Sequence, residues 1–246
     1  EQMIINALDK GLFYLMYQPQ YFVDGKKIRG FEALIRLKDE DGKVISPGVF
    51  IPVAEKSNLI FDIDEYVLNY VSKEFAEVVK EHEDIRVSVN ISANGFCRDN
   101  FVDKVKRILD ENNFPYKNLE IEITEYSMSK SVETTRRNID ALHELGIYIA
   151  LDDFGTGYTT LSKLLELKAN VLKIDKSIVD TIEKTEVNRQ FVDTIGDMGH
   201  LLSCEVLFEG VETLEQIDYI KDMACDCIQG FVWGRPISFE DALKEL

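Results

Sequence analysis

Short runs of apolar and β-branched residues alternate along the chain with longer segments in which apolar residues recur at helical spacing. The short runs lie at residues 13–19, 28–37, 85–92, 119–125, 147–153, 171–175, 205–210 and 225–231. Amphipathic segments at 132–145 and 187–202 separate several of the later runs. This alternation predicts βαβ units and a parallel sheet. Eight strands in a chain of 246 residues predict an α/β fold of the (β/α)8 barrel type.

The first two runs are joined differently from the others. Between them lies the segment VDGKK, in which Asp24-Gly25 predicts a hairpin turn. The start of the barrel should therefore contain one antiparallel strand. The chain shows no linker, low-complexity segment or internal repeat, so residues 1–246 are predicted to form a single domain.

Composition and charge narrow the range of partners. With 45% hydrophobic residues the chain is long enough to bury one substantial core. The formal net charge of −17 argues against a nucleic-acid partner. It permits a small phosphate ligand, provided that cations accompany that ligand.

The sequence predicts neither a membrane segment nor an export signal. No run of 18 apolar residues occurs, and the first residues, EQMIINALDKGLF, lack a basic region followed by an apolar core. The missing initiator Met suggests a fragment of a longer protein. Four cysteines without a CxxC pair favour reduced thiols. We therefore expect a cytoplasmic domain that makes no membrane contact itself. A membrane anchor elsewhere in the parent protein is compatible with this expectation.

Most of the predicted strands contain or end in a polar side chain that could bind a metal ion. These residues are Glu32, Asn90, Glu122, Glu125, Asp152, Asp153, Glu209 and Gln229. The carboxyl ends of barrel strands converge on one face, where active sites lie. An oxygen-rich cage at that face suits hard cations, Mg²⁺ or Mn²⁺. Of the adjacent carboxylates Asp152 and Asp153, one could bridge two ions while its neighbour holds the second, as in two-metal phosphoester displacement.

Lys173, in the run VLKID, is a cation among these acids. It could neutralise the cage, orient a nucleophilic water or stabilise charge in the transition state, and a purely structural ion pair is the alternative. Other chemistries find little support, because the chain contains no GxSxG elbow, P-loop or HExxH motif.

Motifs along nearly the whole chain resemble those of EAL domains, which are bacterial phosphodiesterases specific for cyclic di-GMP. In order, from about Leu12 to Pro236, they are EALIR, SPGVFIPVAEKSNLI, VNIS, EITE, DDFGTGY, LKID, FEGVET and QGFVWGRP. The resemblance implies a TIM-like (β/α)8 barrel with one antiparallel strand. It also implies hydrolysis of cyclic di-GMP to linear pGpG, with two Mg²⁺ or Mn²⁺ ions per active site.

The resemblance further implies a set of metal ligands. Those ligands are Glu32, Asn90, Glu122, Asp152, Asp153 and Glu209. Asp152 would bridge the two ions, and water activated by them would attack the phosphodiester in line.

Other residues receive supporting roles from the same resemblance. Lys173 would position or deprotonate the attacking water, and Gln229 would hold a metal-bound water. Glu125 would anchor the DFGTG loop, and Glu212 would support the site from behind. The implied substrate contacts are Gln18, Leu34 and Arg36, of which Arg36 suits a phosphate oxygen.

The departures from the family pattern are mild. Phe208 precedes EGVE where the family usually has Ala, and Thr159-Thr160 replaces the commoner pair of serines. Neither change removes a ligand, although Phe208 is bulky enough to crowd Glu209. The loop after Asp153 would order around the metals, and the following helix would join two subunits of a homodimer. Loop order would then couple dimerisation to activity.

Three functions are compatible with the sequence. The first is an active cyclic di-GMP phosphodiesterase, and the second is a slow cyclic di-GMP receptor or adaptor with an intact site. The third is another Mg²⁺-dependent barrel enzyme, such as one acting on an enolate, which would leave the paired aspartates and the KID motif unexplained. An upstream sensor, receiver or GGDEF domain in the parent chain would carry the regulation.

Overall fold

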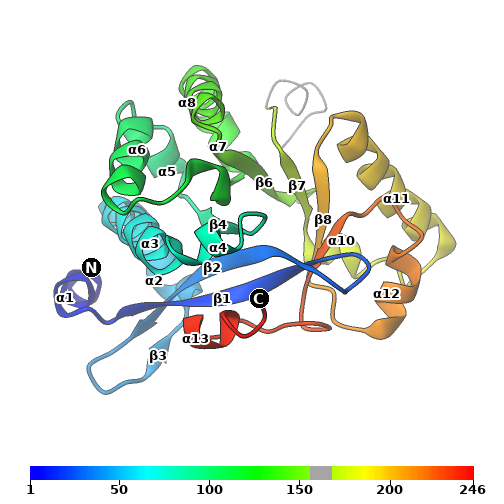
Figure 1. Cartoon of the computed structure of the whole chain (residues 1–246), viewed down its shortest axis with the longest axis horizontal. Coiled ribbons are helices and arrows are strands. Elements are labelled where there is room, and N and C mark those ends of the chain that lie inside the picture. Colours follow the sequence, from blue (N-terminus) through cyan, green and yellow to red (C-terminus); the bar gives the residue numbers. More distant parts are fainter. Residues whose placement is uncertain (156–167) are drawn as a thin grey trace.

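The structure is a computed structural model that describes residues 1–155 and 168–246, without the side chains of residues 125, 128 and 129. The described ranges form a closed barrel of eight strands with helices around it and a ninth, short strand outside (Figure 1). The TIM-like barrel predicted from the sequence is thereby confirmed.

The strands of the described ranges form one mixed sheet. They are β1 (Phe13–Phe22), β2 (Ile28–Lys38), β3 (Val44–Ile45), β4 (Arg86–Asn90), β5 (Leu119–Thr124), β6 (Tyr148–Phe154), β7 (Val171–Ile174), β8 (Glu205–Glu209) and β9 (Cys227–Gln229). Their order is β1-β9-β8-β7-β6-β5-β4-β2-β3, and an additional β1–β2 pairing closes the barrel. Strand β1 runs antiparallel to both β2 and β9, whereas β2 and β4 to β9 pair in parallel.

Helices cover the outside of the barrel (Figure 1). They are α1 (Gln2–Lys10), α2 (Pro47–Ser57), α3 (Ile60–Phe75), α4 (Val78–Glu81), α5 (Ala93–Phe96), α6 (Phe101–Glu111), α7 (Glu125–Lys130), α8 (Val132–Leu145), α10 (Lys176–Val179), α11 (Glu186–Leu201), α12 (Leu214–Ile220), α13 (Phe239–Ala242) and the 3₁₀ helix η1 (Tyr116–Asn118). Helix α6 illustrates why they pack: its buried residues Phe101, Val105, Ile108 and Leu109 fall on one face at helical spacing. Within the described ranges, no helix has both the length and the apolarity that a bilayer-spanning segment needs.

The alternation of side chains along the strands places polar groups inside the barrel. A small apolar cluster, separate from the main core, consists of Ala150, Val171, Leu207 and Cys227. Because side chains two positions apart in a strand share a face, the next inward residues along the same strands are Asp152, Lys173, Glu209 and Gln229. The fold therefore brings these four predicted site residues to the carboxyl ends of neighbouring strands.

Each of the eight predicted runs overlaps one barrel strand, and the antiparallel start is confirmed. Gly25 adopts a left-handed conformation (φ 68°) in the β1–β2 connection, where its N–H donates to Phe22 O at 2.8 Å. Strand β3, which pairs with the end of β2 outside the barrel, was not expected.

A bulge interrupts the pairing of β1 with β2. Gln20 pairs with Gly30 and Tyr21 pairs with Ile28, so Arg29 is the extra residue in β2. Bulges change the direction in which a side chain points. Arg29 is only 2% exposed and, as shown below, contacts residues from the inner face of the barrel.

Candidate active site

Lys173 lies in the middle of a group of carboxylates, here called the Lys173 cluster. Its Nζ is 2.6 Å from Glu122 Oε2, 2.8 Å from Glu209 Oε1 and 3.1 Å from Asp152 Oδ1. A fourth carboxylate oxygen, Glu32 Oε2, is 3.8 Å away. The side chains of Lys173 and Glu122 are fully buried. One ammonium group thus faces four carboxylates from four different strands.

Two side-chain amides hold the Glu32 carboxylate. Asn90 Nδ2 donates to Oε1 at 2.6 Å, and Gln229 Nε2 donates to Oε2 at 2.5 Å. A carboxylate oxygen can accept more than one hydrogen bond or ligand, so both oxygens retain capacity for a cation. The amides orient Glu32 without neutralising its charge.

The Lys173 cluster has too few positive charges for its acids. Burial raises the pKa of Glu122 well above the usual range, and repulsion from Glu32 adds to the effect. Burial likewise raises the pKa of Glu209 to about 8, against the opposing effect of Lys173. Burial lowers the pKa of Lys173, but the four carboxylates outweigh it and raise that pKa well above its usual value. The excess of acids therefore favours either proton uptake or the binding of another cation.

The backbone at Asp153 explains how two adjacent carboxylates can serve one site. Asp153 has a positive φ of 56°, and the β6–β7 register shifts between Leu151 and Phe154. In a regular strand the side chains of Asp152 and Asp153 would point to opposite faces. The left-handed residue breaks that alternation, and aspartate tolerates this conformation better than most residues.

The donor set fits hard divalent cations. Asp152, Asp153 and Glu209 each offer a carboxylate oxygen, and these oxygens lie within 4.8 Å of one another. Glu122 Oε1 is buried and accepts no hydrogen bond from the described residues. An uncompensated buried oxygen among carboxylates and amides is suited to Mg²⁺ or Mn²⁺.

A cavity of about 300 Å³ adjoins the Lys173 cluster through Asn90. Leu34 and Arg36 of β2 line it, together with Ile60 and Asp64 of α3. Its walls are mostly apolar, which suits the face of a planar ring, while Arg36 adds a cation that can bind phosphate.

The remaining predicted site residues have different surroundings. Gln18 is buried in β1 and donates to Gly234 O at 3.3 Å. Glu212 follows β8 and pairs with Lys176 at 3.2 Å rather than with Lys173. Glu125 begins α7, but its side chain lies outside the described residues, as do the DFGTG loop from residue 156 onward and the proposed dimer helix up to residue 167.

Phe208 does not displace Glu209. The ring of Phe208 is fully buried in the main core, which lies on the outer face of the sheet. Glu209 alternates to the inner face, where it reaches Lys173.

The sequence model of the EAL domain family matches residues 1–236. The chain belongs to the EAL domain family.

Curated relatives of this EAL domain are longer proteins. It is 38% identical over 237 residues to the signaling protein YkoW of Bacillus subtilis, covering 96% of this chain and 30% of that protein. It is 34% identical over 247 residues to the probable cyclic di-GMP phosphodiesterase PdeG of Escherichia coli, covering 99% of this chain and 48% of PdeG. The chain therefore spans less than half the length of these relatives.

Solved structures of EAL proteins superpose closely on this chain. The cyclic di-GMP complex of the PaMucR phosphodiesterase matches with a TM-score of 0.92 and 31% identity, and covers 98% of both chains. The EAL enzyme Bd1971 bound to cAMP and cyclic di-GMP matches with a TM-score of 0.93 and 27% identity, over 99% of this chain and 67% of that one.

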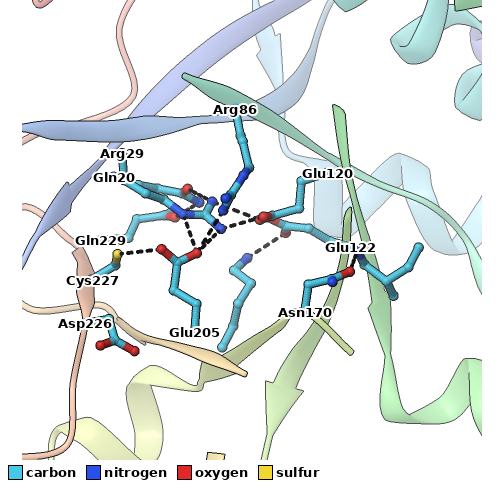
Figure 2. A network of polar contacts seen from close by, with 12 residues as sticks. Gln20, Arg29, Arg86, Glu120, Glu122, Asn170, Glu205, Asp226, Cys227 and Gln229 are labelled. Carbon is cyan, nitrogen blue, oxygen red and sulfur yellow. Dashed lines mark hydrogen bonds and ion pairs between the residues drawn. The ribbon is translucent and has the colours of Figure 1, made fainter. Parts of the chain in front are cut away.

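The EAL domain also contains a buried charged group that the sequence analysis missed, at the amino ends of the strands (Figure 2). Arg29 donates to both oxygens of Glu120 and, at 2.7 Å, to Glu205 Oε2, which also accepts from Arg86 Nη1 at 3.0 Å. Glu120 and Glu205 precede Glu122 and Glu209 by even numbers of residues, so a period of two could have placed them inside the barrel.

Proposed function

We propose that this domain hydrolyses one phosphodiester bond of cyclic di-GMP, giving linear pGpG. The observation that carries the proposal is the Lys173 cluster, in which four strands direct carboxylates to one ammonium group beside a cavity with Arg36 in its wall. Family membership and the named activity of relatives such as PdeG support the choice of substrate.

The proposal assigns the metal ions to the residues whose oxygens are available. Glu32, Asn90, Glu122 and Asp152 would hold one divalent cation, Mg²⁺ or Mn²⁺. Asp152, Asp153 and Glu209 would hold a second one, supported by their mutually close oxygens. When bound, the two cations would lower the pKa of the attacking water and offset the charge of the phosphodiester.

The protein's own residues would bind the substrate and orient the attacking water. Arg36 would bind a phosphate oxygen, while Leu34 and the apolar cavity wall would contact a base, and Gln18 would add a polar contact. Lys173 Nζ would orient the attacking water and stabilise the negative charge that develops on the phosphoryl oxygens. Gln229 would hold a water molecule beside Glu32. Glu212 would support the site from behind through its ion pair with Lys176, and Glu125 would anchor the loop that follows β6.

The proposal also covers the longer protein to which the domain would belong and the oligomeric state in which it would act. The single domain would act as one module of a longer signalling protein, since it spans 30% and 48% of YkoW and PdeG. A GGDEF or sensor domain in that protein would regulate it, and a homodimer would be its working form. The four cysteines, all within the described ranges, form no disulfide, which is compatible with the cytoplasm.

The test is a chromatographic assay of the purified domain with cyclic di-GMP, with and without Mg²⁺ or Mn²⁺, following linear pGpG. Metal-dependent pGpG should form with the wild type and be lost in Asp152→Asn. Asp140→Asn, on the exposed face of α8, serves as the matched control and should remain active. Saturable binding without turnover would instead identify a receptor. The absence of both binding and turnover would refute the proposal.

A further inference from the structure

A row of hydrogen bonds crosses the barrel interior from Arg29 to Glu32. Arg29 Nη1 donates to Gln20 Oε1 at 2.7 Å, Gln20 Nε2 donates to Gln229 Oε1 at 2.9 Å, and Gln229 Nε2 donates to Glu32 Oε2. All four side chains are at least nine-tenths buried. Figure 2 shows Arg29, Gln20 and Gln229 of this row beside the charged group.

The chemistry of the two ends fixes the direction of every hydrogen bond between them. A guanidinium can only donate, and an ionised carboxylate can only accept. Gln20 must therefore turn its oxygen to Arg29 and its nitrogen to Gln229. Gln229 must in turn present its oxygen to Gln20 and its nitrogen to Glu32. Either amide in the opposite orientation would place two donors or two acceptors face to face.

The Arg29 guanidinium, at one end of this row, is held in place by several hydrogen bonds. Both of its terminal nitrogens donate to Glu120, and Nη2 and Nε donate to Glu205 as well. The bulge in β2 supplies the inward direction of the side chain. With the guanidinium held by two carboxylates, the Gln20 amide has one orientation that satisfies all of its neighbours.

We propose that Gln20 is a positioning residue that fixes the Gln229 amide and, through it, the Glu32 carboxylate. This inference rests on the proposed function, because it treats Glu32 as a cation ligand. Glu32 Oε2 is 3.8 Å from Lys173 Nζ, the longest ion pair of the Lys173 cluster. Without the Gln229 donor, Glu32 would move toward that ammonium group and be withdrawn from the cation.

The substitution Gln20→Met tests this role. It removes the donor to Gln229 but leaves Arg29 Nη1 its hydrogen bond to Glu120 Oε1 at 3.0 Å. Mn²⁺ affinity, measured by electron paramagnetic resonance titration without substrate, should fall about 10- to 100-fold, the range for outer partners of metal ligands. Val206→Ala is the matched control. It removes buried volume from the outer face of β8 and should lower stability without changing Mn²⁺ affinity.

A double-mutant cycle separates positioning from general damage. In a Gln229→Met background, adding Gln20→Met should cause no further loss of Mn²⁺ affinity, because Gln20 acts only through Gln229. If Gln20→Met does not fold, Gln20→Glu at pH 8 replaces it, since a carboxylate accepts from Arg29 but cannot donate to Gln229. A folded Gln20 variant with the Mn²⁺ affinity of the wild type would overturn the proposal. So would a double variant in which the losses of Mn²⁺ affinity caused by the two single substitutions add up.

The titration also distinguishes this inference from the proposed function. A wild type that binds Mn²⁺ but forms no pGpG would refute the phosphodiesterase, while the variants would still decide the role of Gln20 by affinity alone.

Discussion

At the scale of single residues, Lys173 is the internal counter-ion of the site. It occupies the position at which four carboxylates meet and is fully buried. Burying a charge is costly unless partners compensate for it. Here the ammonium and the acids stabilise one another, but the acids remain in excess. The residue that would assist the chemistry is therefore also the residue that partly offsets the repulsion among the acids.

Replacing Lys173 with Met should weaken both function and folding. Four carboxylates would lose their shared cation, and leaving buried charge uncompensated costs about 3–5 kcal/mol of the free energy of unfolding. Mg²⁺ should restore more stability to this variant than to the wild type, because it supplies the missing charge. Urea unfolding at pH 8, with and without Mg²⁺, measures both quantities.

The matched control is Lys10→Met. Lys10 of α1 pairs with Glu40 at the surface, so its loss should cost at most about 1 kcal/mol and leave the Mg²⁺ effect unchanged. Equal Mg²⁺ effects in both variants would contradict the role given to Lys173.

At the scale of elements, the strand pattern predicted most of what the structure shows. Period-two alternation and strand-end polar residues suffice to bring Glu32, Glu122 and Asp152 to one face. The inward turn of Arg29 escaped prediction because it depends on one extra residue in the pairing of two strands. A bulge turns a side chain to the opposite face of the sheet, and the local sequence RGFEAL contains no feature that predicts the bulge.

A buried carboxyl group links helix α3 to the residue that caps helix α5. Asp64 accepts hydrogen bonds from Ser92 Oγ at 2.7 Å and from Ser92 N at 3.3 Å, and Ser92 caps α5. Burial raises the pKa of Asp64 from 3.8 to about 7, although the hydrogen bonds from Ser92 and the charge of Lys104 oppose the shift and Glu55 adds to it. The contact of Asp64 with Ser92 should therefore respond to pH.

The pH dependence of stability should carry the signature of Asp64. Between pH 4 and 7 the folded protein binds a proton that the unfolded chain releases, so this group lowers the free energy of unfolding as pH rises. The slope from one group is at most about 1.4 kcal/mol per pH unit. Asp64→Asn should flatten the profile in this window, whereas Asp62→Asn, exposed on the same helix, should not. Identical profiles for Asp64→Asn and the wild type would refute the assignment.

The close contact between β2 and β4 leaves no space for a side chain at Gly30. A Cβ at this position would lie 2.1 Å from Arg86 O, and a backbone oxygen in a barrel strand cannot move aside cheaply. Gly30→Ala should lower the free energy of unfolding by about 1–3 kcal/mol, as overpacking does. Gly48→Ala, in the first turn of α2 with its nearest neighbour at 3.7 Å, is the control and should be neutral or stabilising. Equal stability of both variants in urea would show that the β2–β4 contact is looser than described.

At the scale of the whole molecule, the barrel separates balanced charge from unbalanced charge. At the amino ends of the strands, Arg29 and Arg86 face Glu120 and Glu205, so the charges match in number. At the carboxyl ends, one lysine faces four acids, in a protein whose net charge is −17. The group at the amino ends needs no further counter-ion, whereas the group at the carboxyl ends attracts cations and repels an anionic substrate unless cations are bound.

Divalent cations should therefore stabilise the whole domain and recruit the substrate. A ligand that binds only the folded state raises the free energy of unfolding by about 2.7 kcal/mol at one hundred times its Kd. The melting temperature should rise with Mg²⁺ or Mn²⁺, and after chelation with EDTA cyclic di-GMP should bind weakly. Ca²⁺ should restore substrate binding but support little turnover, because it prefers looser coordination with more ligands. Scanning calorimetry and equilibrium dialysis measure the two effects, and in Asp152→Asn the cation-dependent rise should shrink. A rise of equal size in Asp152→Asn would mean that the cations bind the acidic surface rather than the carboxyl end of the barrel.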